Sequence, residues 1–130
     1  MDGDLFPEQA RMISLILLSV ADTGVRRRKL YFEDFEEPEE NRGLFVDCVY
    51  WLAAEEIIGV ENMGTQGRFS GCSLRSKGFA LMQRQIQFGG DRLMIRDISH
   101  QVKSGRIDRA AAGEFIGGLF AGAIKGFGSG

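Results

Sequence analysis

The chain has 130 residues, of which 44% are hydrophobic and 26% charged, and its formal net charge is −2. This balance is typical of one ordinary globular domain, which at roughly 100–150 residues buries a core without covalent staples. The two cysteines, Cys48 and Cys72, are too few for the disulfide-dense class of small domains. We therefore expect one compact unit in a reducing, cytoplasmic compartment.

Charge is unevenly distributed along the chain. Residues 1–60 hold thirteen acidic and six basic side chains, whereas residues 61–130 hold five acidic and ten basic ones. The chain as a whole therefore lacks the basic excess that is typical of nucleic-acid-binding proteins. An acidic half and a basic half are suited to attract a charged partner or a second copy of the chain.

The first predicted helix spans residues 7–21, and Gly24 ends it in a left-handed conformation. Its apolar positions recur every three or four residues: Ala10, Ile13, Ile16, Leu17 and Val20. Residues 13–21 have the length of a secretory signal core, but acidic side chains dominate the preceding segment, so we interpret the run as a buried helix. No apolar run approaches the roughly 20 residues that span a bilayer.

Three further segments precede residue 57. A basic segment, residues 26–29, leads into residues 30–32, which form a short strand or begin a second helix, and the acidic residues 33–40 predict a short helix and a turn. A longer helix is expected from Asn41, as its cap, to about residue 56. Its apolar stripe consists of Leu44, Phe45, Cys48, Val49 and Leu52.

The next segment is a predicted hairpin with a glycine-rich tip. Residues 57–60 and 68–74 are its strands, and residues 64–67 form its turn. A helix is expected over residues 76–88, broken by Gly89 and Gly90, and Asp91 can cap another helix that ends at Gly105.

This order of elements resembles a winged helix-turn-helix domain, and the resemblance covers roughly residues 7–88. Winged-helix proteins similar to the MarR and PadR families return from the wing into a segment like Leu-Thr-x-Lys-Gly-x-x-Leu. Here Leu74, Lys77, Gly78 and Leu81 match that segment, with Arg75 in the place of threonine. The resemblance implies a mainly α fold with a small β-hairpin wing (α+β), in which the helix from residue 41 would enter the major groove of DNA.

The residue types on that helix disagree with a DNA-reading role. No lysine or arginine follows Arg42 within it, and Asp47 would repel phosphates. A DNA-binding function would therefore depend mainly on cations outside the helix, through phosphate contacts. The candidate nucleic-acid contacts are Arg26, Arg27, Arg28, Lys29, Arg42, Arg68, Arg75 and Lys77. Alternatively, these cations face the acidic stretch 33–40 within one molecule or a dimer.

Two aromatic residues on the outer side of this helix, Tyr50 and Trp51, are candidates for partner binding because aromatic side chains are enriched in interface hot spots. The alternative is that they form the rim of the core.

The segment 107–130 is rich in alanine and glycine. On a helix, Gly118, Gly122 and Gly126 form a smooth strip, with bulky apolar residues such as Leu119 beside it. Because each interior glycine costs about 1 kcal/mol relative to alanine, such a helix should form only when docked. Docking on its own domain or a second copy, a flexible tail, and contact with a membrane surface or foreign partner all remain open.

No catalytic or metal-binding constellation is apparent. His100 is the single histidine and has only Asp97 at a suitable spacing, and the two cysteines suit buried apolar positions. The glycines at 64, 67 and 71 lack the Gly-Lys-Ser/Thr ending of a phosphate loop. We therefore expect no enzyme activity, no cofactor and no metal.

The sequence thus predicts a winged-helix-like domain over residues 1–90 and a helical extension over residues 91–130. Its expected function is a non-catalytic interaction module that binds a protein partner and self-associates, as a homodimer for example, through the glycine-rich segment. A winged-helix DNA-binding regulator is the alternative, and a membrane-docked protein acting through its tail is a weaker one.

Overall fold

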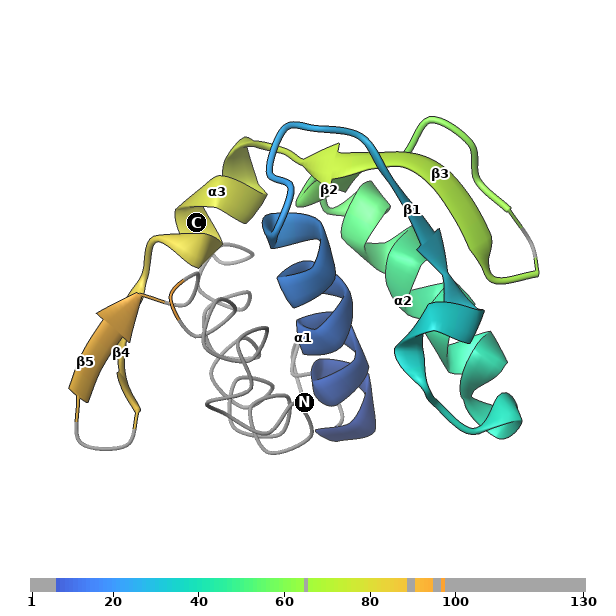
Figure 1. The fold of residues 1–130 in the computed structure, drawn as a ribbon, viewed down its shortest axis with the longest axis horizontal. Helices are drawn as coiled ribbons and strands as arrows, with labels where there is room; N and C mark the ends of the chain where they lie inside the picture. Colours follow the sequence, from blue (N-terminus) through green and yellow to red (C-terminus); the bar gives the residue numbers. More distant parts are fainter. Residues whose placement is uncertain (1–6, 65, 89–90, 95–96, 98–130) are drawn as a thin grey trace.

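The computed structural model describes residues 7–64, 66–88, 91–94 and 97, and these form an α+β fold of helices and small antiparallel sheets (Figure 1). In chain order the elements are α1 (Pro7–Ala21), β1 (Arg28–Tyr31), the 3-10 helices η1 (Phe32–Phe35) and η2 (Glu39–Asn41), α2 (Arg42–Ala54), β2 (Ile58–Gly59), β3 (Arg68–Leu74), α3 (Ser76–Met82), β4 (Gln85–Phe88) and β5 (Asp91–Met94).

Helix α1 has the bounds that its sequence predicts, but it is buried on every side rather than along one stripe. All residues from Met12 to Leu18 are buried, including Ser14, whose hydroxyl donates to the Ala10 carbonyl at 2.7 Å. A helix that is apolar all round belongs in a core. Gly24 has a φ of +59°, as expected for its left-handed position, and its amide donates to the Val20 carbonyl.

The main sheet has the strand order β1–β3–β2, with both pairs antiparallel. The hairpin of β2 and β3 is confirmed, with Ile58 opposite Leu74, and residues 28–31 form a strand rather than the start of a helix. Gly71 in β3 has a φ of +68°, and the pairing of β1 with β3 shifts register beside it. A left-handed glycine at such a shift is typical of a β-bulge.

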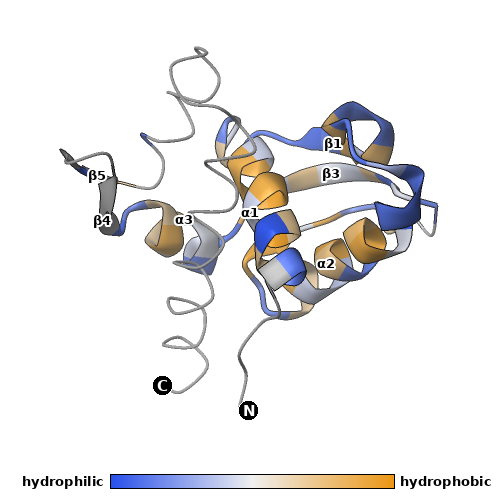
Figure 2. Cartoon of the chain, turned by 90° about the horizontal axis from the view of Figure 1, so that it is seen from below, coloured by the Kyte–Doolittle hydropathy of each residue, from blue (hydrophilic) through white to orange (hydrophobic). Residues whose placement is uncertain are grey.

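The core lies between the sheet and the two long helices, which cover the same face of the sheet (Figure 1). Phe45 of α2 is fully buried, and its ring centroid lies 5.0–6.0 Å from those of Phe32, Phe35 and Phe69. Figure 2 shows hydrophobic residues concentrated on α1 and α2 and hydrophilic ones along β1 and the segment that leads into it.

The acidic segment 33–40 forms the two 3-10 helices, close to its predicted short helix and turn. The predicted side-chain cap of α2 is wrong, because Asn41 makes no cap hydrogen bond. Its side-chain amide instead donates a hydrogen bond of 3.0 Å to the Glu37 carboxylate. The same carboxylate accepts two hydrogen bonds from Arg11.

The predicted helix over residues 76–88 is wrong beyond Met82, and the helix predicted to start at Asp91 is also wrong at its start. Residues 85–88 and 91–94 are the antiparallel strands β4 and β5, with Ile86 opposite Leu93. Polar and apolar residues alternate in 85–88, and a Gly-Gly pair between two such runs is a hairpin signal. The two strands pair across residue 90, where the first unit was expected to end.

Within the described residues, no helix is long and apolar enough to cross a membrane.

Candidate interaction surfaces

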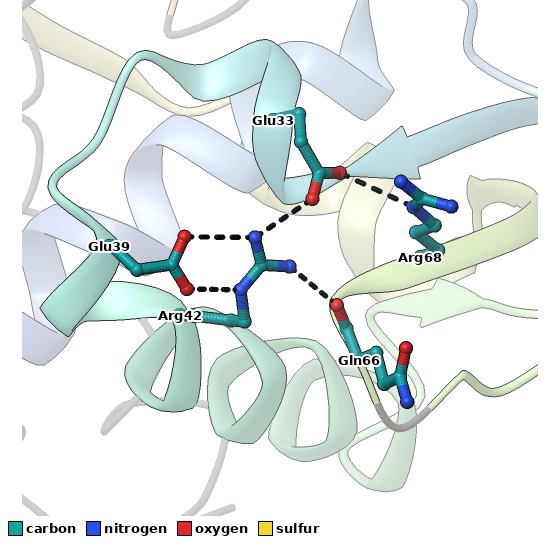
Figure 3. Close-up of polar contacts among 5 residues, drawn as sticks. All are labelled: Glu33, Glu39, Arg42, Gln66 and Arg68. Atoms are coloured by element: carbon teal, nitrogen blue, oxygen red, sulfur yellow. Dashed lines mark hydrogen bonds and ion pairs between the residues drawn. The ribbon is translucent and has the colours of Figure 1, made fainter.

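Arg42, at the start of α2, is the centre of a polar cluster that joins three parts of the fold (Figure 3). Its guanidinium donates to the carboxylates of Glu33 in η1, at 2.9 Å, and Glu39 in η2, at 3.0 Å. It also donates to the Gln66 carbonyl before β3 at 2.6 Å, and lies 4.7 Å from the centroid of the Phe32 ring. Arg42 is therefore engaged within the molecule rather than presented to a phosphate.

The charges of this cluster stabilise one another. Hydrogen bonds from Arg42 hold the pKa values of Glu33 and Glu39 below the usual range, and the two carboxylates raise the pKa of Arg42. The second oxygen of Glu33 lies 3.6 Å from Arg68 of β3. The acidic stretch thus binds Arg42 closely and Arg68 only through this longer contact, and the Arg68 side chain stays 65% exposed.

The outward side of α2 offers no cation to a partner. Asp47 is exposed on it, and Gly43 has no atoms within 4 Å of the position that a Cβ would take. Tyr50 is 39% exposed, and its ring meets that of Phe69 edge to face at 6.0 Å. Trp51 is partly buried and packs against the core, as its rim alternative implies.

The remaining candidate cations are either bound within the molecule or exposed without an ion pair. Arg27 pairs with Glu61 at 2.9 Å, and Arg28 donates to the Ser19 carbonyl of α1 at 2.6 Å. Lys29 lies 5.7 Å from the Tyr31 ring centroid. Of the candidate cations, Arg26, Lys29, Arg75 and Lys77 are exposed and have no ion pair to any described residue.

Both cysteines are free, buried thiols. Burial raises the pKa of Cys48 to about 12, with a smaller contribution from Asp47, and raises that of Cys72 to about 11. Such thiols are poor nucleophiles and metal ligands at neutral pH. Among the described residues, no group of three or more histidine, cysteine, aspartate or glutamate side chains is placed to hold a metal ion.

Some sequence candidates lie outside the described residues. These are His100 and the glycine-rich positions Gly118, Leu119, Gly122 and Gly126.

Tyr31 and Gln66 prove central to these surfaces although they were not among the sequence candidates, and Glu33 was included only as part of the acidic stretch 33–40. Side chains alternate between the two faces of a strand, so the apolar Leu30 indicates that Tyr31 lies on the opposite face. The spacing of three residues between Glu39 and Arg42 indicates an ion pair. The contact to Gln66 spans 24 residues and follows from no local pattern.

No protein-family model matches the chain, and neither a curated protein nor a solved structure matches it.

Proposed function

We propose that the chain is a non-catalytic winged-helix interaction module that binds a protein partner through the outward side of α2. The order of a helix, a strand, short helices, a longer helix, a hairpin and a helix supports the winged-helix assignment. The interaction role is supported by one observation above the others. The helix that would read DNA presents Asp47 and Tyr50, while its one arginine is held by Glu33 and Glu39.

The physical argument concerns which partner could stay bound to this face. A DNA phosphate next to Asp47 would meet a like charge, with no cation on the helix to offset it. A protein partner can cover the Tyr50 ring and place a hydrogen-bond donor or a cation against Asp47. The α2 face therefore suits a protein surface with apolar and basic groups.

Site-specific photo-crosslinking tests this proposal. A benzophenone amino acid in place of Tyr50 should crosslink, in cells, to a protein and give a product that resists nuclease. The substitution Asp47→Lys in the same chain should abolish that product, because it reverses the charge beside the crosslinker.

The matched control places the same crosslinker at Lys77, which is exposed on α3. It should give no product, or a product that Asp47→Lys does not change. A nuclease-sensitive product at Tyr50 would favour the DNA-binding alternative, and the absence of any product specific to Tyr50 would overturn the proposal.

Self-association through residues 107–130 remains part of the proposal and derives from the glycine spacing alone. Light scattering should give a dimer or larger mass for the full chain and a monomer for Gly122→Leu. A chain that ends after Arg109 should also be a monomer. We also propose a cytoplasmic location, because two cysteines that are both free thiols suit a reducing compartment.

A further inference from the structure

The main sheet has an outer face, on the side away from α1 and α2. Because side chains alternate between the two faces along a strand, the buried positions show which residues lie on the outer face. In β1, Leu30 is buried against the helices, so Lys29 and Tyr31 lie on the other face. In β3, Phe69 is buried, so its neighbour Arg68 also lies on the other face, and the register places Arg68 directly opposite Tyr31. Both cations lie 5.7 Å from the centroid of the Tyr31 ring.

Two further arginines lie across the same outer face. Arg27 pairs with Glu61, whose side chain occupies the place that a Cβ of Gly71 would take, so this ion pair spans β3 at the bulge. Beyond it, the aliphatic part of Arg75 lies within 3.6 Å of the Cβ position of Gly59, in β2. Arg68 begins β3 and Arg75 directly follows it, so the cations extend over about 23 Å at about 3.3 Å per residue.

Among the described residues, neither α1 nor α2 covers this outer face, and its exposed side chains are mainly cationic. Figure 1 shows α1 and α2 on the other side of the sheet, and Lys29, Arg68 and Arg75 are all exposed. In the described part of the chain, two carboxylates pair with cations of this face. Glu61 pairs with Arg27, and Glu33 is held mainly by Arg42, with Arg68 in a longer contact at 3.6 Å. Lys29 and Arg75 have no ion pair to any described residue.

We propose that the outer face of the β1–β3–β2 sheet binds single-stranded nucleic acid, with a base stacked against Tyr31 and the backbone phosphates held by Lys29, Arg68 and Arg75. An aromatic ring within a row of cations on the face of a sheet is the combination that such binding uses, because every base has a π-face and every nucleotide a phosphate. A duplex keeps its bases stacked inside and could use only the cations.

This inference does not depend on the protein-binding function proposed above, because it concerns the other layer of the molecule. The protein-binding face lies on α2, whereas the nucleic-acid face lies on the side of the sheet that α2 does not cover. A partner protein and a single strand could therefore be bound together.

Fluorescence anisotropy of the full chain with labelled oligothymidylate of about 12 nucleotides tests the inference. Across about 50–200 mM salt, three phosphate contacts should give a slope of about −2 for the logarithm of the binding constant against that of the salt concentration. Lys29→Gln should reduce its magnitude by about 0.7. Tyr31→Leu should weaken binding at least about fivefold, the lower end of the loss for a stacked aromatic residue, whereas Tyr31→Phe should keep the affinity.

Lys77→Gln is the matched control, since it removes an exposed cation on α3 rather than on the sheet, and it should leave affinity and slope unchanged. Circular dichroism and thermal melting show whether Tyr31→Leu is folded, and Lys29→Gln tests the face without changing a packed residue. Three outcomes would each overturn the inference: duplex DNA or polyglutamate binding as tightly as the single strand, a folded Tyr31→Leu binding like the wild type, or Lys77→Gln losing as much as Lys29→Gln.

Discussion

The side chain of Arg42 donates a 2.6 Å hydrogen bond to the backbone carbonyl of Gln66, which joins the first turn of α2 to the loop that leads into β3. The same guanidinium binds Glu33 and Glu39, so one residue links the two 3-10 helices, α2 and the hairpin loop. The position of that loop relative to α2 therefore depends on a charged side chain as well as on apolar packing.

We expect Arg42→Gln to lower stability at neutral pH and to flatten its loss in acid. In the folded protein Arg42 lowers the pKa of Glu33 and of Glu39, so their stabilising contribution is complete above the ordinary glutamate pKa of about 4.3. It is lost as the pH falls through the lower folded values. Urea midpoints of the two proteins should therefore differ more at neutral pH than in acid, where the lost hydrogen bond to the Gln66 carbonyl leaves a smaller difference.

The effect should be modest, because the cluster is largely exposed and solvent screens it. Lys77→Gln, which removes a cation without an ion pair to described residues, should match the wild type at neutral pH and in acid. A gap between Arg42→Gln and the wild type that is equally large in acid would contradict the pKa argument.

Phe45→Ala should destabilise the protein by about 3–5 kcal/mol, the usual cost of truncating a buried phenylalanine. Phe45 is fully buried, and its ring contacts those of Phe32, Phe35 and Phe69, so the cavity would open between α2 and the sheet. Urea unfolding measures the loss. Tyr50→Ala, at a 39% exposed position of the same helix, should cost less than half as much.

Two glycines should respond to alanine with opposite signs. A Cβ at Gly78 would overlap the Ile57 carbonyl and the Leu74 side chain, so Gly78→Ala should cost about 1–3 kcal/mol. At Gly43, in α2, a Cβ would meet nothing, so Gly43→Ala should add about 0.5–1 kcal/mol through helix propensity. Thermal melts of both variants beside the wild type test the pair, and equal signs would count against the packing argument.

Neither cysteine should react with a thiol reagent in the native protein at about pH 8. Burial raises the pKa of Cys48 and of Cys72 well above that pH, so almost no thiolate is present, and the thiols are covered. Absorbance with an aromatic disulfide reagent should show no release before urea is added and two thiols per chain afterwards. Rapid release from the folded protein would contradict the burial of these residues.

The sequence predicts the elements that have a strong local period. Helix α1, helix α2 and the β2–β3 hairpin follow from apolar spacing and from the glycines between the strands, and the structure has them near the expected bounds. The error lies at Gln85–Met94, where apolar residues such as Ile86 and Phe88 fit either period over so short a run. Residues 85–88 form a strand because they pair with residues 91–94.

The candidate surfaces were less accessible to sequence reasoning, because they depend on contacts between distant segments. Arg42 was selected as a phosphate ligand from its charge, whereas its partners Glu33 and Gln66 come from the η1 helix and the hairpin loop. The role of Tyr31 follows from its pairing with Arg68, 37 residues later in the chain, and a strand register cannot be deduced from either segment alone.

The two outer strands of the main sheet differ from the central one in a way that bears on aggregation. One edge is β1, which has Arg28 and Lys29 and follows Arg26 and Arg27, and the other is β2, which is only two residues long. Clustered cations and very short strands at sheet edges oppose pairing between molecules, because they repel or truncate an incoming strand. The protein should therefore resist edge-to-edge polymerisation of this sheet even at high concentration, and low salt should strengthen that resistance.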